Sequence, residues 1–410
     1  MANESIEWSP LQLEFYAVEV SNDVDFLIIG GGAMGSAAAW SLASAWHEVL
    51  LLERFAPGHM EGASHGATRN FNPAYTEPEY LRLLQRSDAL WDSLSEQAGT
   101  RLLERTGLVN HGIVAEQRAM HQVLAHAGFG SELLSIAAAE ERFAGMKFET
   151  EVLHIPAGGQ INADLAVASL QKLAVAHGAA VEYGHRVTAL QVLADDRVEV
   201  QVQHQGTMSA IRARHAIVTA GAWTAQLLGD AFKLPAIHVT EEHPVHFAQK
   251  DLPAHWPGFN HTLDPARDIG SRVFGPIYGM RTPGEGIKVG WHGSGRIIDP
   301  ERRPHQASDE QLRALQDYAA RWLPGADPSR YETVSCTYAN TADEHFILDS
   351  LGPVTVGAGF SGHGFKFVPA IGEYLADLAL GRRAADPLFS ATRTAAKPVF
   401  LERRRAVGLG

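Results

Sequence analysis

Short apolar runs, glycine-rich turns and helix-forming stretches alternate along the first part of the chain. The apolar run Asp25–Ile29 leads directly into GGGAMG, an alanine-rich stretch over 36–46 follows, and a second apolar run, Val49–Leu52, ends at Glu53. Short apolar runs bounded by turn residues are typical of buried strands, and alanine-rich stretches are typical of helices. The pattern therefore predicts a strand, a tight turn, a helix and a second strand.

This order is the β-α-β unit that binds a dinucleotide. The glycines of the motif would let the backbone approach a pyrophosphate at the helix N-terminus, and Glu53 would bind a ribose hydroxyl. These glycines are Gly30, Gly32 and Gly35. A glycine motif alone is a weak signal, whereas the complete order with a terminal acid is much more specific. Because NAD and FAD both carry such a ribose, the unit does not choose between them.

The same kind of architecture returns twice further along the chain. Residues 165–182 read as a helix followed by a strand, and the apolar run His215–Val218 ends in TAGAW. The run Val354–Val356 leads into GAGFSGHGFKF, before a helix predicted over Ala370–Leu380. We expect these glycine turns to converge on one site. The last turn favours FAD over NAD, because a helix N-terminus there could face the flavin ring and stabilise negative charge on reduction.

Two less regular stretches separate these segments. They contain alternating runs such as Gly286–Trp291 (GIKVGW), which predict strands of a second sheet. We predict an α/β protein, with a Rossmann-like FAD-binding domain and an inserted α+β substrate domain that carries a mixed or antiparallel sheet. The predicted ranges are 23–102, 160–234 and 336–390 for the FAD-binding domain, 103–159 and 235–335 for the substrate domain, 1–22 for an N-terminal extension and 391–410 for a C-terminal tail.

Composition limits the classes of partner. The chain has 410 residues, enough for two domains, and 34 Lys and Arg against 47 Asp and Glu give a net charge of −13. This acidity argues against nucleic acid or an anionic membrane as partner, and no apolar run approaches the roughly 18–20 residues of a membrane span. The first basic residue is Arg54, so we expect no secretory signal, and the basic cluster 403–405 is expected to be a solvated tail. We expect a cytoplasmic monomer without a metal site.

Cys336, in SCTYANTADEHF, is the only cysteine of the chain. A lone cysteine forms neither an internal disulfide nor a thiolate metal cluster. Three interpretations remain from the residue alone: a small buried hydrophobic side chain, a nucleophile, or an attachment point for an electrophile.

Six motifs together carry a family resemblance. DFLIIGGGAMG, SHGATR, TAGAW, IKVGWH, SCTYANTADEHF and AGFSGHGFKF resemble the monomeric sarcosine oxidase and N-methyltryptophan oxidase group of the D-amino-acid-oxidase-like FAD superfamily, over about 25–388. The resemblance implies FAD as cofactor, attached through a thioether between Cys336 and the 8-methyl carbon of the flavin. It also implies a small-molecule amine as substrate and O2 as electron acceptor.

The resemblance implies roles for individual residues. Thr68 and Arg69 would lie against the flavin, where the guanidinium balances the anionic reduced form. Lys288 would activate oxygen, because a fixed cation stabilises the charge that develops as oxygen is reduced, and Lys366 would pair with the substrate carboxylate. The implied substrate-binding set is Asn72, Tyr278, His292, Tyr338 and Lys366. The implied cofactor-binding set is Gly30, Gly32, Gly35, Glu53, Arg54, Ser64, His65, Thr68, Arg69, Val187, Ala220, Gly221, Trp223, Cys336, Gly359, Gly362, His363, Gly364, Phe365 and Lys366.

Two positions depart from the family pattern. Three residues after the Thr–Arg pair the pattern has a second arginine that clamps the substrate carboxylate, and this chain has Asn72. A bidentate guanidinium contact is thus replaced by a neutral amide. Either another cation such as Arg272 or Arg281 joins the lysine, or the substrate has no α-carboxylate. Ser64 also replaces the first of two paired histidines, of which His65 is kept.

The resulting hypothesis is an FAD-dependent oxidase of secondary amines, with N-alkyl amino acids as expected substrates and sarcosine itself doubtful because of Asn72. A hydride equivalent would pass to the flavin, the imine would hydrolyse, and O2 would be reduced to H2O2. Three alternatives stay open: a dehydrogenase that uses another electron acceptor, an oxidase of fructosyl amino acids or cyclic imino acids, and a non-catalytic FAD-binding subunit.

Overall fold

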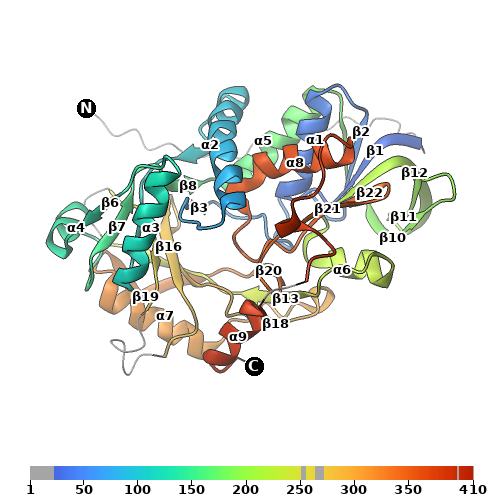
Figure 1. Ribbon diagram of the computed structural model, residues 1–410. Coiled ribbons are helices and arrows are strands. Elements are labelled where there is room, and N and C mark those ends of the chain that lie inside the picture. Colours follow the sequence, from blue (N-terminus) through green and yellow to red (C-terminus); the bar gives the residue numbers. More distant parts are fainter. Residues whose placement is uncertain (1–22, 251–254, 264–271, 395–396, 410) are drawn as a thin grey trace.

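Two large sheets organise the chain (Figure 1). The computed structural model describes residues 23–250, 255–263, 272–394 and 397–409, and the predicted N-terminal extension 1–22 lies outside them. Within these ranges each large sheet has eight strands, and two three-stranded sheets accompany them. No helix in the described part of the chain combines the length and apolarity needed to cross a bilayer.

The first large sheet is mostly parallel. Its strands follow the order β9-β2-β1-β12-β22-β21, with β21 antiparallel to β22, and the N-terminal half of β12 continues into an antiparallel meander with β11 and β10. The apolar runs of the sequence form β1, β2, β22 and the end of β12. The strands are β1 (Asp23–Ile29), β2 (Val49–Glu53), β9 (Ala180–Tyr183), β10 (Arg186–Val192), β11 (Val198–His204), β12 (Thr207–Val218), β21 (Ile347–Leu351) and β22 (Val354–Ala358).

Helices α1, α5 and α8 cover one face of this sheet, and the meander packs on the other (Figure 1). Helix α1 packs against both other helices and is buried on almost all sides, which explains why its sequence is apolar throughout. Gly372 of α8 lies so close to α1 that a Cβ at this position would be 2.6 Å from Ala37. The helices are α1 (Ala33–Ser44), α5 (Ala163–Ala176) and α8 (Val368–Ala379).

The long helix α2 (Pro78–Ala98) has no counterpart among the predicted elements. Its signals are nevertheless present, with Pro78 in the first turn and Gly99 in the left-handed conformation just past the last turn. The helix packs against α8. From it, the Ser87 hydroxyl and the Trp91 indole donate hydrogen bonds of 2.7 and 2.9 Å to the carbonyl oxygen of Lys366. Helix α2 therefore fixes the backbone of a predicted substrate-binding residue.

The second large sheet is mainly antiparallel. Its order is β19-β14-β17-β16-β15-β5-β7-β6, in which β15 and β5 are parallel. Ile287 and Val289 lie in the core with residues of α7, whereas Lys288 between them points to the opposite face. The elements are β5 (Leu108–His111), β6 (Glu132–Leu134), β7 (Val152–Ile155), β14 (Val245–Gln249), β15 (Gly258–His261), β16 (Ile277–Thr282), β17 (Gly286–Trp291), β19 (Ala326–Thr333), α3 (Val114–His126), α4 (Ile136–Arg142) and α7 (Asp309–Trp322).

Two small sheets complete the described part of the chain. One has the order β18-β13-β20, and the other has the order β3-β8-β4. The elements are β3 (Arg69–Phe71), β4 (Leu103–Glu104), β8 (Gly159–Ile161), β13 (Ile237–Glu242), β18 (Arg296–Ile297), β20 (Cys336–Thr341), α6 (Thr224–Leu228) and the 3₁₀ turn η4 (Phe365–Phe367). The predicted fold class is confirmed, and we propose the two large sheets with their helices as the two predicted domains.

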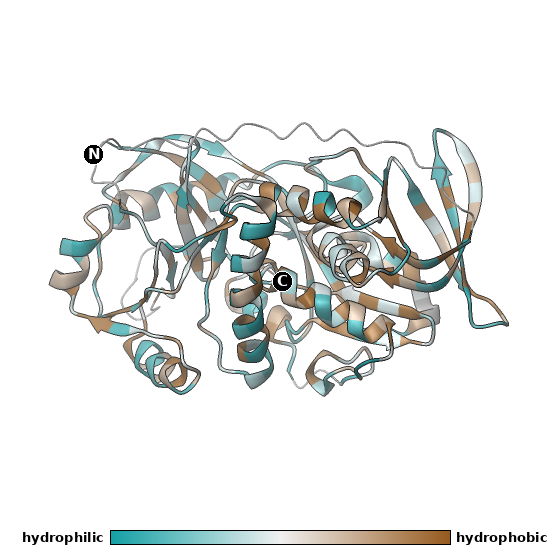
Figure 2. Cartoon of the chain, turned by 90° about the horizontal axis from the view of Figure 1, so that it is seen from above, coloured by the Kyte–Doolittle hydropathy of each residue, from teal (hydrophilic) through white to brown (hydrophobic). Residues whose placement is uncertain are grey.

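Hydropathy follows these layers (Figure 2). Brown and teal residues alternate along the outer helices, as expected for helices with one buried and one solvated face. Helix α7 is a clear case, because Leu315, Tyr318 and Trp322 are buried at helical spacing while its other face is exposed. The core of each layer thus lies between the sheet and its covering helices.

The C-terminal segment corrects the sequence-based prediction of a solvated tail. It contains helix α9 (Val399–Ala406), in which Phe400 is fully buried and Arg404 is 6 % exposed. The Arg404 guanidinium donates a 2.6 Å hydrogen bond to the carbonyl oxygen of Gly295, and Arg403 forms a 2.6 Å ion pair with Glu344. The basic cluster looked solvated because its partners lie far away in the sequence.

A stacked histidine pair in the second core predicts loss of stability in acid. The rings of His111 and His261 lie 3.8 Å apart; burial lowers the pKa of His111 well below its usual value and that of His261 to about 3. In the unfolded chain histidine has a pKa of about 6.5, so stability is complete above that pH and is lost as pH falls toward 3. From His261 alone, we expect the free energy of unfolding to fall by about 2 kcal/mol between about pH 7.5 and about pH 5, measured by urea denaturation.

The variant His261→Phe should flatten this pH dependence. His126→Gln, on the exposed end of α3, serves as the matched control. An unchanged slope in His261→Phe would contradict the assignment.

Candidate active site

One cavity of about 740 Å³ brings the predicted site together. Its wall includes the first glycine turn, the segment after β12, the start of β20, the middle of β17 and the last glycine turn. All predicted site residues line it except Gly35 and Gly359. These two shape the backbone instead: a Cβ on Gly35 would lie 2.0 Å from the Gly30 carbonyl oxygen, and Gly359 has a φ of +65°.

The first glycine turn and Glu53 form the dinucleotide end of the cavity. Gly30 has a φ of +104°, which favours glycine, and a Cβ on Gly31 would lie 2.9 Å from the Cβ of Glu53. The Glu53 carboxylate is 6 % exposed and accepts hydrogen bonds from the backbone N–H groups of Gly31 (2.7 Å) and Phe55 (2.9 Å). A carboxylate therefore lies beside a glycine turn whose backbone is not covered by side chains. The first is what a ribose hydroxyl requires, and the second is what a pyrophosphate requires.

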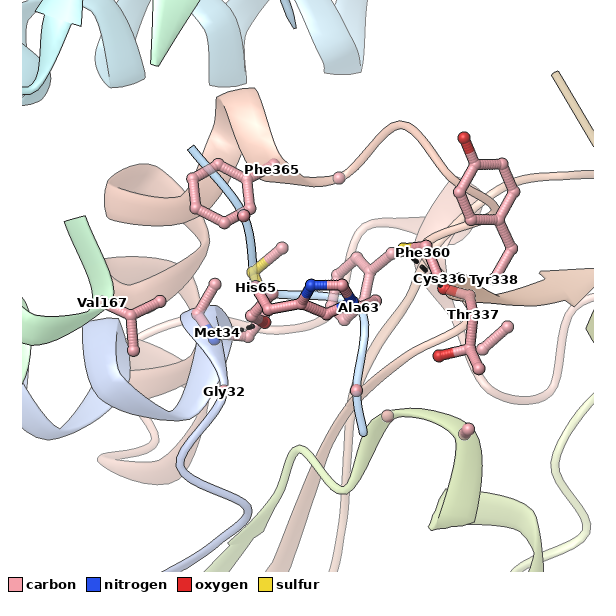
Figure 3. A pocket seen from close by; sticks show the side chains of 18 of the residues that line it. Gly32, Met34, Ala63, His65, Val167, Cys336, Thr337, Tyr338, Phe360 and Phe365 are labelled. Carbon is pink, nitrogen blue, oxygen red and sulfur yellow. Dashed lines mark hydrogen bonds between the residues drawn. The ribbon is translucent and has the colours of Figure 1, made fainter. Parts of the chain in front are cut away.

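Ser64 and His65 follow this turn in space. The Ser64 hydroxyl accepts a 2.9 Å hydrogen bond from the N–H of Ala33, so it caps the first turn of α1. His65 is 6 % exposed, and neither ring nitrogen has a hydrogen-bond partner among the described residues. Burial and the nearby Arg69 lower its pKa to about 3, so the ring is neutral. In Figure 3 this ring lies between the Gly32–Met34 turn and the strand with Cys336, where a ligand could satisfy its nitrogens.

Arg54 has a different environment from the other predicted cofactor residues. It forms hydrogen bonds of 2.6 and 2.8 Å with Glu301, a lining residue that the sequence did not suggest. Its guanidinium also lies over the rings of Phe55 and Trp223, at 4.9 and 5.3 Å. The charge of Arg54 is therefore already balanced within the protein. Val187, Ala220 and Gly221 line the same end of the cavity.

Thr68, Arg69 and Lys288 form a cationic group in the cavity wall. Arg69 donates hydrogen bonds to the carbonyl oxygens of Thr68 (2.8 Å), Ala63 (2.9 Å) and His65 (2.5 Å), which fixes the guanidinium. The Lys288 ammonium donates a 3.4 Å hydrogen bond to the Thr68 carbonyl oxygen. Burial, and then the charge of Arg69, lower the pKa of Lys288 to about 7. Near neutral pH the Lys288 side chain can therefore be either an ammonium or a neutral amine.

Cys336 begins β20 and is 9 % exposed. It pairs across the ladder with Glu242 of β13 and lines the cavity beside Tyr338 (Figure 3). Glu241 and Arg303 form a buried ion pair beside the preceding Ser335. The Ser335 hydroxyl donates a 2.5 Å hydrogen bond to the Glu241 carboxylate and accepts a 2.8 Å hydrogen bond from Arg303. The thiol is therefore on a fixed strand and faces the space in which a ligand would lie.

Lys366 lies in η4 at another part of the wall. Its ammonium donates hydrogen bonds to the Tyr75 hydroxyl (3.0 Å) and the His363 carbonyl oxygen (2.7 Å). His363 Nε2 lies 3.0 Å from the Glu344 carbonyl oxygen and must donate to it, so Nδ1 accepts the 2.9 Å hydrogen bond from Tyr75. Burial lowers the pKa of Lys366 to about 7. Tyr75 was not predicted, although it follows SHGATR by six residues.

Three further predicted substrate residues lie close to one another in the cavity wall. The rings of Tyr278 and Tyr338 lie 6.5 and 5.5 Å from the ring of His292. Burial, and then the charges of Arg403 and Lys366, lower the pKa of His292 to about 3. All three residues line the cavity, which is therefore aromatic and neutral on this side.

Asn72 lines the cavity, but its side-chain oxygen Oδ1 accepts a 3.0 Å hydrogen bond from the backbone N–H of Ala74. The two cations considered as substitutes lie elsewhere. Arg272 forms an ion pair with Glu310, and Arg281 donates a 2.9 Å hydrogen bond to Gln249; neither belongs to the described cavity wall. The suggestion that Arg272 or Arg281 joins Lys366 is therefore wrong, because each points to a partner outside the cavity.

The sequence and the fold both match those of known proteins. The family model described as FAD dependent oxidoreductase (DAO) matches residues 25–378. The chain is 32 % identical to a monomeric sarcosine oxidase of Streptomyces avermitilis, over 92 % of this chain and 100 % of that protein. It is 30 % identical to an N-methyl-L-tryptophan oxidase of Yersinia pestis, over 86 % and 94 %. The solved structure of NikD, an unusual amino acid oxidase essential for nikkomycin biosynthesis, superposes with a TM-score of 0.78 at 26 % identity, over 90 % of this chain and 98 % of that chain.

The match confirms the resemblance that the motifs carry. It spans both large sheets and every segment of the cavity wall, and it ends before helix α9. The bare glycine turn, the buried acid and the unpartnered imidazole fit an FAD molecule. The chain belongs to the DAO family of FAD-dependent oxidoreductases.

Proposed function

We propose that the protein is an FAD-dependent oxidase of secondary amines, with N-alkyl amino acids as substrates and O2 as electron acceptor. The observation that carries the proposal is the pair Lys288 and Lys366. Both ammonium groups line one cavity, are 7 % and 6 % exposed, and form no ion pair within the described residues. A buried cation without a counter-ion is costly, so its retention points to an anion that binds there or forms there.

The cavity wall supports FAD as the bound group. Glu53 would hold a ribose, the first glycine turn would hold the pyrophosphate, and Thr68 and Arg69 would contact the flavin. Cys336 would attach the flavin through a thioether. When bound, FAD supplies the acceptor for a hydride from the carbon next to the amine nitrogen and returns the electrons to O2, which yields H2O2.

Lys366 would hold the substrate carboxylate. A carboxylate beside it favours its charged form and raises its pKa from about 7, so binding of the anion fixes the lysine as an ammonium. Tyr75 and His363 orient the lysine, and the aromatic wall of Tyr278 and Tyr338 accommodates an apolar side chain. The surrounding cations disfavour an ammonium on the substrate, so the neutral amine is the form selected.

The comparisons support the substrate class through the names of the relatives, which act on sarcosine and on N-methyl-L-tryptophan. Asn72 argues for a bulkier substrate than sarcosine. A small substrate depends on its carboxylate contacts, whereas a larger one gains binding energy from buried apolar surface.

The test is anaerobic bleaching of the flavin absorbance by a panel of amines, followed by measurement of peroxide formed per substrate consumed. The panel contains sarcosine, bulkier N-methyl amino acids, cyclic imino acids, fructosyl amino acids and amines without a carboxylate. We expect bleaching by N-methyl amino acids and a ratio near one. Rapid dye reduction with a ratio near zero would establish a dehydrogenase instead, and an unbleached flavin throughout would favour a non-catalytic subunit.

Sarcosine should be a poor substrate, and Asn72→Arg should improve it. A charged hydrogen bond to the carboxylate contributes about 1.5–3 kcal/mol, so we expect kcat/KM for sarcosine to rise roughly 10–100-fold. Steady-state kinetics with sarcosine and with a bulky N-methyl amino acid measure the effect, and Asn72→Gln is the neutral control. High efficiency of the unmodified protein with sarcosine would refute this interpretation of Asn72.

A further inference from the structure

A row of ionisable side chains crosses the second sheet and ends at Lys288. Strands β19, β14 and β17 are neighbours, and their register pairs Glu332 with His246 and His246 with Lys288. Paired residues of an antiparallel ladder point to the same face with Cβ atoms about 4.5–5.5 Å apart. Glu332 is exposed on the edge strand, whereas His246 and Lys288 are 6 % and 7 % exposed. The row therefore runs from solvent to the cavity.

Glu285 gives this row a second contact with solvent. It lies in the turn between β16 and β17, and its carboxylate is 2.9 Å from His246 Nδ1. The side chain of Glu285 is 47 % exposed, while that of His246 is 6 % exposed. The hydrogen bond from His246 lowers the pKa of Glu285, which keeps the carboxylate charged. Glu285, His246 and Lys288 all line the cavity.

The proposed oxidase reaction needs one proton at this place. A neutral secondary amine loses a hydride and leaves an iminium ion, and the hydride carries two electrons and one proton equivalent. Reduction of O2 to H2O2 takes up these two electrons and two protons. One proton arrives with the hydride, and the other must come from the protein or from water.

On the basis of the proposed function, we propose that Glu285 and His246 form a proton relay that recharges Lys288 during oxygen reduction. The Lys288 ammonium gives one proton to the reduced oxygen and becomes an amine. The His246 imidazolium, held by the Glu285 carboxylate, returns a proton to Lys288 directly or through one water molecule. The bare Nε2 atom then takes up a proton from solvent, while the Nδ1 proton stays in its hydrogen bond to the Glu285 carboxylate. One solvent proton is consumed for each O2 reduced, so atoms and electrons balance.

Other charged groups around Lys288 do not provide this path. The Arg69 guanidinium is already hydrogen-bonded to three backbone carbonyl oxygens, and arginine side chains do not act as proton donors in proteins. Met280, the neighbour of Lys288 on β16, is uncharged and has no exchangeable proton to pass on. Glu332 faces His246 from β19, but Glu285 is the carboxylate at bonding distance. The pair also ties β14 to the β16–β17 turn, so the test has to separate proton transfer from support of the turn.

The decisive measurement is stopped-flow reoxidation of the reduced holoenzyme by O2. His246→Gln keeps a hydrogen-bonding side chain but cannot relay protons, and Glu285→Gln removes the charge alone. We expect the reoxidation rate of His246→Gln to fall roughly 10²-fold, the lower end of what a general acid contributes. In His246→Gln the solvent deuterium isotope effect on reoxidation should increase, and added imidazole should restore the reoxidation rate. Anaerobic flavin reduction in this variant should stay within about twofold of that in the unmodified protein. Glu332→Gln is the matched control and should behave like the unmodified protein.

A second readout does not depend on turnover. In protein with ¹⁵N-labelled histidine, the His246 signals, assigned by their loss in His246→Gln, should show Nδ1 protonated and Nε2 free at high pH. In Glu285→Gln this preference for a proton on Nδ1 should weaken, because a neutral amide oxygen is a weaker acceptor than a carboxylate.

Three results would overturn the relay: reoxidation within twofold of normal in both variants, a parallel loss of the anaerobic reduction rate, or an equal loss in Glu332→Gln. If the unmodified protein forms no peroxide, the proposed function and the relay fall together. If it forms peroxide normally while both variants reoxidise at its rate, only the relay falls.

Discussion

Replacement of Lys288 by methionine is expected to slow reoxidation of the reduced enzyme by about 10²–10³-fold. Methionine keeps the length of the side chain and removes the charge that would stabilise the anion formed as O2 accepts electrons. Lys288 is buried beside Arg69 and bonded to the Thr68 carbonyl oxygen, so its ammonium is fixed in a region of low polarity where a charge has a large effect. Stopped-flow mixing of the reduced enzyme with oxygenated buffer measures the rate.

The matched variant is Lys366→Met, and its pattern should be the opposite. Lys366 belongs to the Tyr75–His363 group, so its loss should weaken binding of carboxylate substrates and leave reoxidation nearly unchanged. Lys288→Arg should recover part of the oxygen reaction, because it restores charge but not shape. If Lys288→Met lowers anaerobic reduction and reoxidation equally, the role of Lys288 in the oxygen reaction is wrong.

Replacement of Cys336 by alanine should release all flavin from the denatured protein. The unmodified protein should keep its yellow colour in the pellet after acid precipitation, and its intact mass should exceed that of the chain by one FAD. Because Cys336 is the only cysteine, no other thiol of the chain can form the thioether. The folded variant should still bind FAD through the glycine turn and Glu53, so the difference appears on denaturation.

Thr337→Ser tests whether disturbance of β20 alone causes the release. Thr337 lines the cavity next to Cys336 and is buried, but it has no thiol. This variant should retain the flavin after denaturation. Complete loss of colour from the unmodified protein in acid would show that the tether does not exist.

The fold was predictable where local patterns carry the information. The alternation around Lys288 and the last glycine turn are each recognisable within about a dozen residues, and the β-α-β unit is recognisable within the single segment 25–53. The structure has all three at those places. Glu53, Lys288 and Lys366 meet at one cavity, as the motifs implied. What failed was the C-terminal segment, because burial of Arg404 depends on Gly295, more than a hundred residues away.

Some residues near the cavity were not predicted from the sequence, and the reason is again that their partners lie far away along the chain. Tyr75 belongs to no glycine motif and becomes visible only when α2 and η4 place Lys366 beside it. His246 is an ordinary residue of an alternating strand until the register sets it next to Lys288. Arrangements of this kind follow from strand register and helix packing over long separations, which a single sequence does not display.

The position of β12 between β1 and β22 sets the order in which the site can assemble. Ile29, at the end of β1, pairs with Val218, and the same Val218 pairs with Val356 of β22. The two glycine turns thus reach one sheet edge only after very long loops close, and such high contact order slows folding. A ligand that contacts both glycine turns would hold them together once they have met, and would stabilise the native chain by mass action. For this protein the cofactor is therefore expected to be a folding partner as well as a reagent.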